Sequence, residues 1–149
     1  MTITTTTHLN FRGDARQALE FYGSVFGAQP TIATYGDFGM PADAPGADNV
    51  VFGQIETADG FRIMAYDIPG DAAPTTGSTH RENGVTITDQ TFFVSVRGDT
   101  LEEIEGYWAA LSVGASIVEP LAASAWGPGF GMLTDGFGVT WILDVAAAR

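Results

Sequence analysis

LNFRGD at residues 9–14 decides the fold, because the chain repeats this stretch as VSVRGD at residues 94–99, an offset of 85 residues. Each copy closes on a second repeat, DGF, at residues 59–61 and again at residues 135–137. Self-similarity at a fixed spacing means that one supersecondary unit is used more than once. We therefore expect two related halves of one domain, with the functional site between them.

Each half is expected to fold as a strand, a helix and three further strands. The Thr-rich residues 3–11 favour a strand. Capping boxes are expected to begin the helices, with Asp14 and Gln17 in the first copy and Asp99 and Glu102 in the second. Gly27 and Gly114 are expected to end them. The later strands are predicted over residues 31–35, 50–57, 61–68, 116–119, 131–134 and 139–145. This order predicts an α+β fold in which two tandem βαβββ modules form a curved, mixed sheet around a cleft.

Two stretches rich in Gly, Pro and small polar residues interrupt the repeat. Residues 36–48 and 69–83 are predicted to be loops, and either loop would form a lid if it folded over the cleft. The whole chain, residues 1–149, is expected to be one domain, because this length suits a single core. Its parts are module one at about residues 3–68, a linker at 69–88, and module two at about 89–146.

The charge and composition of the chain exclude several classes of function. The net charge is −12, with 18 acidic residues against six arginines and no lysine. Such a field repels nucleic acid and anionic membrane surfaces, so neither is an expected partner. The absence of cysteine excludes disulfides and thiolate sites. No signal sequence or long apolar run is seen, and a cytoplasmic protein is expected.

Three stretches of the chain resemble a known family. They are residues 8–14 with 18–22 and 26–28, the segment from Trp126 to Met132, and the segment from Asp135 to Trp141. Together with the duplicated module they resemble the vicinal oxygen chelate superfamily, which has the glyoxalase, bleomycin-resistance and extradiol-dioxygenase fold. More narrowly, they resemble its bacterial branch often labelled demethylubiquinone methyltransferase-like. The resemblance covers nearly the whole chain, and it implies a glyoxalase-like fold.

The resemblance also implies where a metal would be bound. Metal-dependent members hold a divalent cation on one His, Gln or Glu side chain from each of four strands. The matching positions here are Thr6, Thr91, Ile142, and Met64 or Ala65. Neutral hydroxyls and apolar side chains cannot offset the desolvation of a divalent cation, so no metal cofactor is expected. The alternative is a divalent metal with His8 as a ligand after a register shift, joined by Gln90 or Asp67.

Aromatic side chains are frequent on the strands and loops predicted to line the cleft. The candidate ligand-binding residues are Thr6, His8, Tyr35, Met64, Tyr66, Thr91, Trp126 and Trp141. An apolar cleft with a few polar groups is typical of a small-molecule site. The sequence therefore predicts a metal-free protein that binds an apolar or aromatic small molecule, as in antibiotic sequestration, and works as a homodimer. The alternatives are a metal-dependent lyase, isomerase or dioxygenase, and an interaction module whose cleft is filled by its own side chains. No catalytic residue is assigned.

Overall fold

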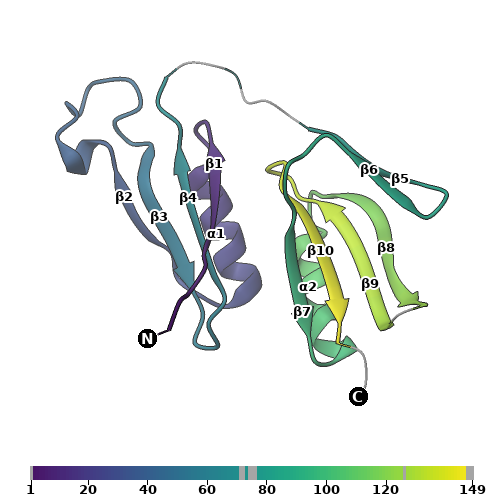
Figure 1. Cartoon of the computed structure of the whole chain (residues 1–149). Helices are drawn as coiled ribbons and strands as arrows, with labels where there is room; N and C mark the ends of the chain where they lie inside the picture. The colour runs from purple at the N-terminus through teal and green to yellow at the C-terminus, as the bar shows by residue number, and fades with distance from the viewer. Residues whose placement is uncertain (1, 71–72, 74–76, 126, 147–149) are drawn as a thin grey trace. The chain divides into compact units, whose positions relative to one another are not determined.

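The computed structural model describes residues 2–70, 73, 77–125 and 127–146. These residues form two compact units, which divide between residues 74 and 75 (Figure 1). Each unit contains one helix packed on a four-stranded sheet. The α+β class and the tandem βαβββ modules expected from the sequence are thereby confirmed.

Unit 1 follows the predicted order of elements. They are β1 (Thr7–Phe11), α1 (Ala15–Phe26), β2 (Thr31–Thr34), the short 3-10 helix η1 (Gly36–Phe38), β3 (Val50–Glu56) and β4 (Arg62–Asp67). The sheet has the order β1-β4-β3-β2, in which β1 and β4 are parallel and the other neighbours are antiparallel. The first and last strands of the repeat therefore lie side by side.

The core of unit 1 lies between α1 and one face of the sheet. Ala18, Leu19 and Tyr22 of α1 are fully buried, and they follow the helical spacing seen in the sequence. A Cβ on Gly53 would lie 2.9 Å from the backbone oxygen of Ala65 and would also clash with Leu19. Strand β3 approaches the helix closely only because this residue is glycine.

The start of α1 differs from the prediction. Asp14 occupies the N-cap position, but its side chain makes no capping hydrogen bond. The buried carboxylate of Asp67, at the end of β4, accepts hydrogen bonds from the backbone N–H groups of Gly13 and Ala15 instead. A residue distant in sequence therefore performs the task that we assigned to a local capping box. The predicted helix end is confirmed, since Gly27 has a φ of 78°.

Unit 2 repeats the module and adds a hairpin before it. Its elements are β5 (Thr79–Glu82), β6 (Val85–Thr88), β7 (Val94–Gly98), α2 (Leu101–Leu111), β8 (Ser116–Ser124), β9 (Gly127–Thr134) and β10 (Thr140–Val145). The main sheet has the order β7-β10-β9-β8, with β7 parallel to β10. Thr100, one residue after the predicted cap, accepts a hydrogen bond from the backbone N–H of Glu103.

Three expectations for unit 2 need correction. Residues 79–88 were expected to be linker, yet they form the β5–β6 hairpin. Strands β8 and β9 are also longer than predicted, since they extend to Ser124 and back from Gly127. Short, polar strands carry too weak a signal to be recognised without their pairing partners. Neither described helix has the length and apolarity needed to cross a membrane.

Candidate functional site

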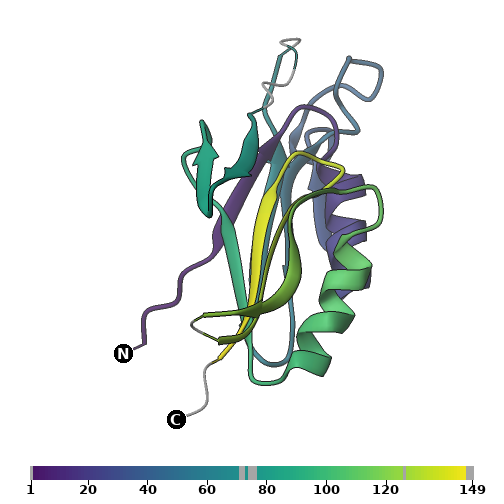
Figure 2. The same cartoon turned by 90° about the vertical axis from the view of Figure 1, so that its right-hand side faces the viewer.

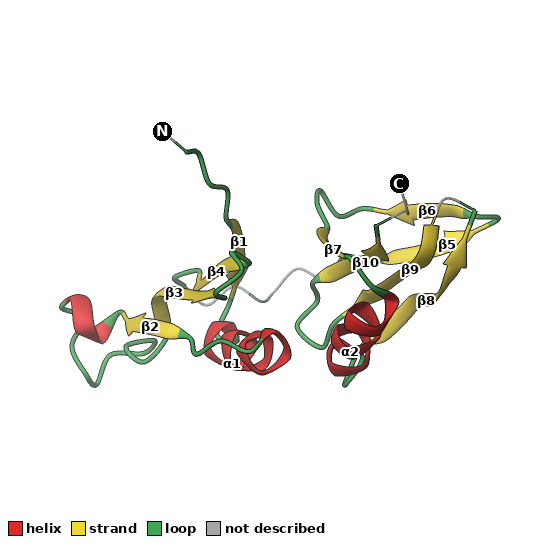
Figure 3. Ribbon diagram, turned by 90° about the horizontal axis from the view of Figure 1, so that it is seen from below, coloured by secondary structure: helices red, strands yellow, loops and turns green. Residues whose placement is uncertain are grey.

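The sheet face opposite α1 carries most of the residues predicted for the site in unit 1. Strand register places His8 beside Met64, and Met64 beside Gln54. Their neighbours Leu9 and Ala65 are buried, and successive side chains point to opposite faces of a sheet. His8, Met64 and Gln54 therefore form a row on the face away from α1. Figure 3 shows no helix or strand among the described residues of unit 1 on that face.

Tyr66 and Asn10 form the next row along the same face. The Nδ1 atom of His8 lies 3.0 Å from Oδ1 of Asn10, within hydrogen-bonding distance. The edge of the His8 ring approaches the Tyr66 ring, with centroids 5.3 Å apart. His8 is exposed, whereas Met64 and Tyr66 are half-buried. Aromatic, thioether, amide and imidazole groups are thus brought together on one accessible surface, which we call the open face of unit 1.

Tyr35 lies at the end of this surface. Its hydroxyl donates a 2.6 Å hydrogen bond to the backbone oxygen of Asp67. Burial, followed by the nearby Tyr66 and Asp67 side chains, raises the pKa of Tyr35 above its ordinary value of 10.0. Tyr35 is therefore held in its neutral, donating form. Thr6 lies just before β1, two residues ahead of His8, and is not among the residues that pair β1 with β4.

The predicted site residues of unit 2 are not brought together in this way. Thr91 is exposed in the loop before β7, and Trp126 lies outside the described residues. Trp141 is 0% exposed, and its Nε1 donates a 2.9 Å hydrogen bond to Asp135. Strand register pairs Trp141 with Leu133, on the face where a Cβ on Gly131 would touch Trp108 of α2. Trp141 is thus a core residue, and the ligand surface proposed below does not include it.

The opposite face of the unit 2 sheet carries a row of residues that includes Ile142, one of the positions that match a metal ligand in the family. Register aligns Ser95, Ile142, Met132 and Glu119 across its four strands. The β5–β6 hairpin lies over the β8 and β9 side of this face, and α2 lies on the other side of the sheet (Figures 2 and 3). The alternation in residues 79–88 was the available sequence signal for this cover, but those residues were assigned to the linker between the modules.

The residues on these faces do not fit a divalent metal. Register pairs His8 of β1 with Met64 of β4, and Ser95 of β7 with Ile142 of β10. Each of these strand pairs therefore offers at most one side chain that suits a divalent ion, and the serine hydroxyl is a weak ligand. Asp67 is engaged, because both its carboxylate oxygens accept backbone hydrogen bonds. Within the described part of the chain there is no group of three or more His, Cys, Asp or Glu side chains that could hold a metal ion.

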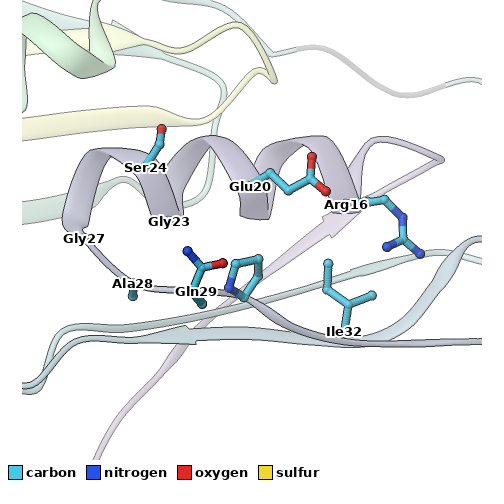
Figure 4. A pocket seen from close by; sticks show the side chains of 9 residues that line it. Arg16, Glu20, Gly23, Ser24, Gly27, Ala28, Gln29 and Ile32 are labelled. Atoms are coloured by element: carbon cyan, nitrogen blue, oxygen red, sulfur yellow. The ribbon is translucent and has the colours of Figure 1, made fainter.

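A concave feature of unit 1 lies along α1 and the segment leading into β2 (Figure 4). It is an open groove with a volume of about 850 Å³. Its lining is mostly polar or backbone, and consists of Arg16, Glu20, Gly23, Ser24, Gly27, Ala28, Gln29, Pro30 and Ile32. None of the predicted site residues lines this groove. It has the shape of a surface depression rather than of an enclosed ligand site.

The chain belongs to the Glyoxalase/Bleomycin resistance protein/Dioxygenase superfamily, whose family model matches residues 6–143. This match confirms the resemblance found in the sequence. Protein PA1353 from Pseudomonas aeruginosa is a similar solved structure, with 27% identity, a TM-score of 0.78, and coverage of 99% of this chain and 100% of that chain. The PhnB protein from Bacillus cereus, named as a candidate 3-demethylubiquinone-9 3-methyltransferase, is 26% identical with a TM-score of 0.70. That match covers 97% of this chain and 100% of that chain.

A more distant structure shares the fold alone. The fosfomycin resistance protein FosX from Listeria monocytogenes, solved with Mn(II) and 1S,2S-dihydroxypropylphosphonic acid, is 14% identical with a TM-score of 0.58. The match covers 100% of this chain and 94% of that chain. A comparison with curated proteins finds no relative of this chain.

Proposed function

We propose that this chain binds a small apolar or aromatic organic molecule on the open face of unit 1, without a metal ion, and releases it unchanged. The observation that carries the proposal is the cross-strand cluster of His8, Met64 and Tyr66, on a sheet face that no helix or strand among the described residues of unit 1 covers. Antibiotic sequestration is the role in this superfamily that such binding would serve. The predicted contribution of unit 2 to the same site stays a prediction.

The chemistry of the open face supports a mixed apolar and polar ligand. Tyr66 and Met64 offer a flat ring and a polarizable thioether, which adapt to aromatic surfaces. His8, Asn10 and Gln54 supply hydrogen-bonding groups that would orient a ligand by its polar atoms. The hydrogen bond between His8 and Asn10 holds the imidazole in one orientation.

A metal-dependent lyase, isomerase or dioxygenase is the alternative. Two observations favour it: His8 and Gln54 share one row of the open face, and FosX has the same fold and was solved with Mn(II). Met64 lies between the two side chains in that row. A metal would therefore need further ligands that the register does not supply.

An interaction module without a ligand is the second alternative. The observation that favours it is the β5–β6 hairpin, which covers part of the unit 2 sheet with the chain's own side chains. This alternative predicts that aromatic molecules bind nowhere on the protein. Ligand titration therefore separates it from the proposed function.

Metal analysis of the purified protein, combined with thermal melts, tests the proposal. A divalent ion that binds only the native state raises the melting temperature by mass action. We expect no stoichiometric metal and no rise with nickel, zinc, manganese or iron(II). A rise that is lost in His8→Ala but kept in His80→Ala, which removes the other histidine, would establish the metal-dependent alternative.

A screen of aromatic natural products and antibiotics should then give a compound that raises the melting temperature. Tyr66→Ala should weaken its binding about fivefold, since stacking on an aromatic ring contributes on the order of 1 kcal/mol. Binding that is unchanged in both Tyr66→Ala and His8→Ala would exclude the open face. The homodimer and the cytoplasmic location expected from the sequence remain proposals, and sedimentation equilibrium would test the former.

A further inference from the structure

Side chains of the β5–β6 hairpin contact strands β8 and β9 of the unit 2 sheet. Arg81 lies beside Glu119 of β8, with Nε 3.6 Å from Oε2, and its guanidinium carbon lies 5.6 Å from the centre of the Phe130 ring. The hydroxyl of Thr86 lies 3.5 Å from the sulfur of Met132. Arg81 therefore contacts both a carboxylate and an aromatic ring of the sheet.

The hairpin faces the sheet with its polar side. Register pairs Arg81 with Thr86 on the inner face, so Val85 and Ile87 lie on the outer face. Val85 is 60% exposed and Ile87 is 42% exposed. A strand pair packed permanently on a sheet normally buries its apolar side. This hairpin is therefore not held down by hydrophobic burial.

Arg81 is only partly satisfied in its position. Its side chain is 19% exposed, and Nη1 donates a 2.8 Å hydrogen bond to Thr86, within the hairpin itself. Among the described residues, Nε is buried and has no hydrogen-bond partner, since 3.6 Å to Glu119 is too long for a hydrogen bond. Glu119 and Phe130 therefore attract the Arg81 guanidinium, but its Nε atom is left without a hydrogen bond among the described residues.

The hairpin is stabilised by hydrogen bonds within itself. The Thr79 and Thr88 hydroxyls are 2.8 Å apart across the two strands. The backbone N–H of Ser78 donates to the Asp89 carboxylate at 2.8 Å, which closes the base of the hairpin. None of these bonds involves the main sheet of unit 2.

We propose that Phe130, Met132 and Glu119 form a binding site for an aromatic cation, and that Arg81 occupies this site in the present conformation. A molecule that replaces Arg81 must offer a positive charge to the carboxylate of Glu119 and a flat face to Phe130. The chain's net charge of −12, without lysine, attracts cations to its surface. All the residues of this site lie within unit 2.

Benzamidine and benzamide form a matched pair of probes, because they differ mainly in charge. Arg81 competes with an added cation at an effective concentration in the millimolar range or above. Replacing it in Arg81→Met, which keeps an apolar side chain, should therefore tighten benzamidine binding at least about tenfold. Benzamide should gain little. His80→Ala, on the outer face of the same hairpin, is the control and should bind benzamidine as the wild type does.

Further variants locate the site. Adding Glu119→Gln to Arg81→Met should abolish the gain in benzamidine affinity. Adding Tyr66→Ala instead should leave that gain unchanged. A gain lost with Tyr66→Ala but kept with Glu119→Gln would place the ligand on unit 1 and overturn this inference, while the proposed function would stand. Equal benzamidine binding by the wild type and Arg81→Met would also overturn it.

Hydrogen exchange on the wild-type protein provides a test that does not depend on a variant folding. Millimolar benzamidine should speed amide exchange across residues 79–88 and in the part of β9 around Met132, and benzamide at the same concentration should not. Unchanged exchange under saturating benzamidine would show that the hairpin does not move aside, and would refute the proposal.

Discussion

Replacement of Asp67 by Asn tests how the first module is held together. The Asp67 side chain is 1% exposed and accepts three backbone hydrogen bonds, from Gly13 at 2.7 Å, Ala15 at 3.0 Å and Val50 at 2.9 Å. Hydrogen bonds to a charged group each contribute about 1.5–3 kcal/mol. Asn keeps one acceptor oxygen but turns an N–H₂ group toward a backbone donor. We therefore expect Asp67→Asn to lower the free energy of unfolding by about 2–4 kcal/mol.

Asp14→Ala is the matched control. Asp14 holds the N-cap position, but its side chain is exposed and makes no capping hydrogen bond. Its removal should change the free energy of unfolding by no more than about 0.5 kcal/mol. Urea unfolding followed by far-ultraviolet circular dichroism measures both variants. Amide exchange at the start of α1 should rise in Asp67→Asn and remain unchanged in Asp14→Ala.

The reverse ranking would refute the reasoning. If Asp14→Ala cost as much as Asp67→Asn, the helix would depend on its local cap, and the link from β4 would contribute little. A change in unfolding midpoint accompanied by a changed slope would instead indicate that the two units unfold separately, and the exchange data would then decide.

Three further substitutions test the packing of unit 1, the helix of unit 2 and the titration of Tyr35. Gly53→Ala should lower the free energy of unfolding by about 1–3 kcal/mol, because the new methyl group would meet the helix and the adjacent strand. Gly106→Ala, where a Cβ meets nothing within 4 Å, should raise it by about 0.5–1 kcal/mol through helix propensity, and urea unfolding checks both. The folded state raises the pKa of Tyr35 above its ordinary value of 10.0, so the folded protein holds this proton more tightly than the unfolded chain does. The contribution of Tyr35 to the free energy of unfolding should therefore be complete below pH 10.0 and should be lost as the pH rises through the raised pKa. The stability difference between the wild type and Tyr35→Phe should shrink over that range, and a constant difference would contradict the raised pKa.

Local patterns predicted the elements that depend on neighbouring residues. The apolar spacing of α1 matches its buried residues, and the glycine at position 27 ends the helix. Alternation along β4 also agrees with the structure, since Ile63 and Ala65 are buried while Met64 and Tyr66 lie on the other face. These signals are readable because backbone geometry repeats every 3.6 or 2 residues.

The candidate site was only partly predictable, because strand register and helix packing bring together residues that are distant in the sequence. His8, Met64 and Tyr66 were identified as candidates, and strand register does bring them to one face. Trp141 was misplaced, because an aromatic residue on a strand fits either face until the helix position is known. The hairpin over unit 2 was missed because its attachment depends on Arg81, which meets its partners only through the fold.

Local sequence patterns were enough to predict that one βαβββ unit is used twice, that the fold is α+β, and where each helix lies within a residue or two. Those properties follow from periodicity and from the residues that begin and end local elements. Three features became visible in the folded chain alone: Asp67 caps α1, Trp141 belongs to the core, and a hairpin covers part of the second sheet. Each of these depends on a contact between residues distant along the chain, and strand register and helix packing set such contacts.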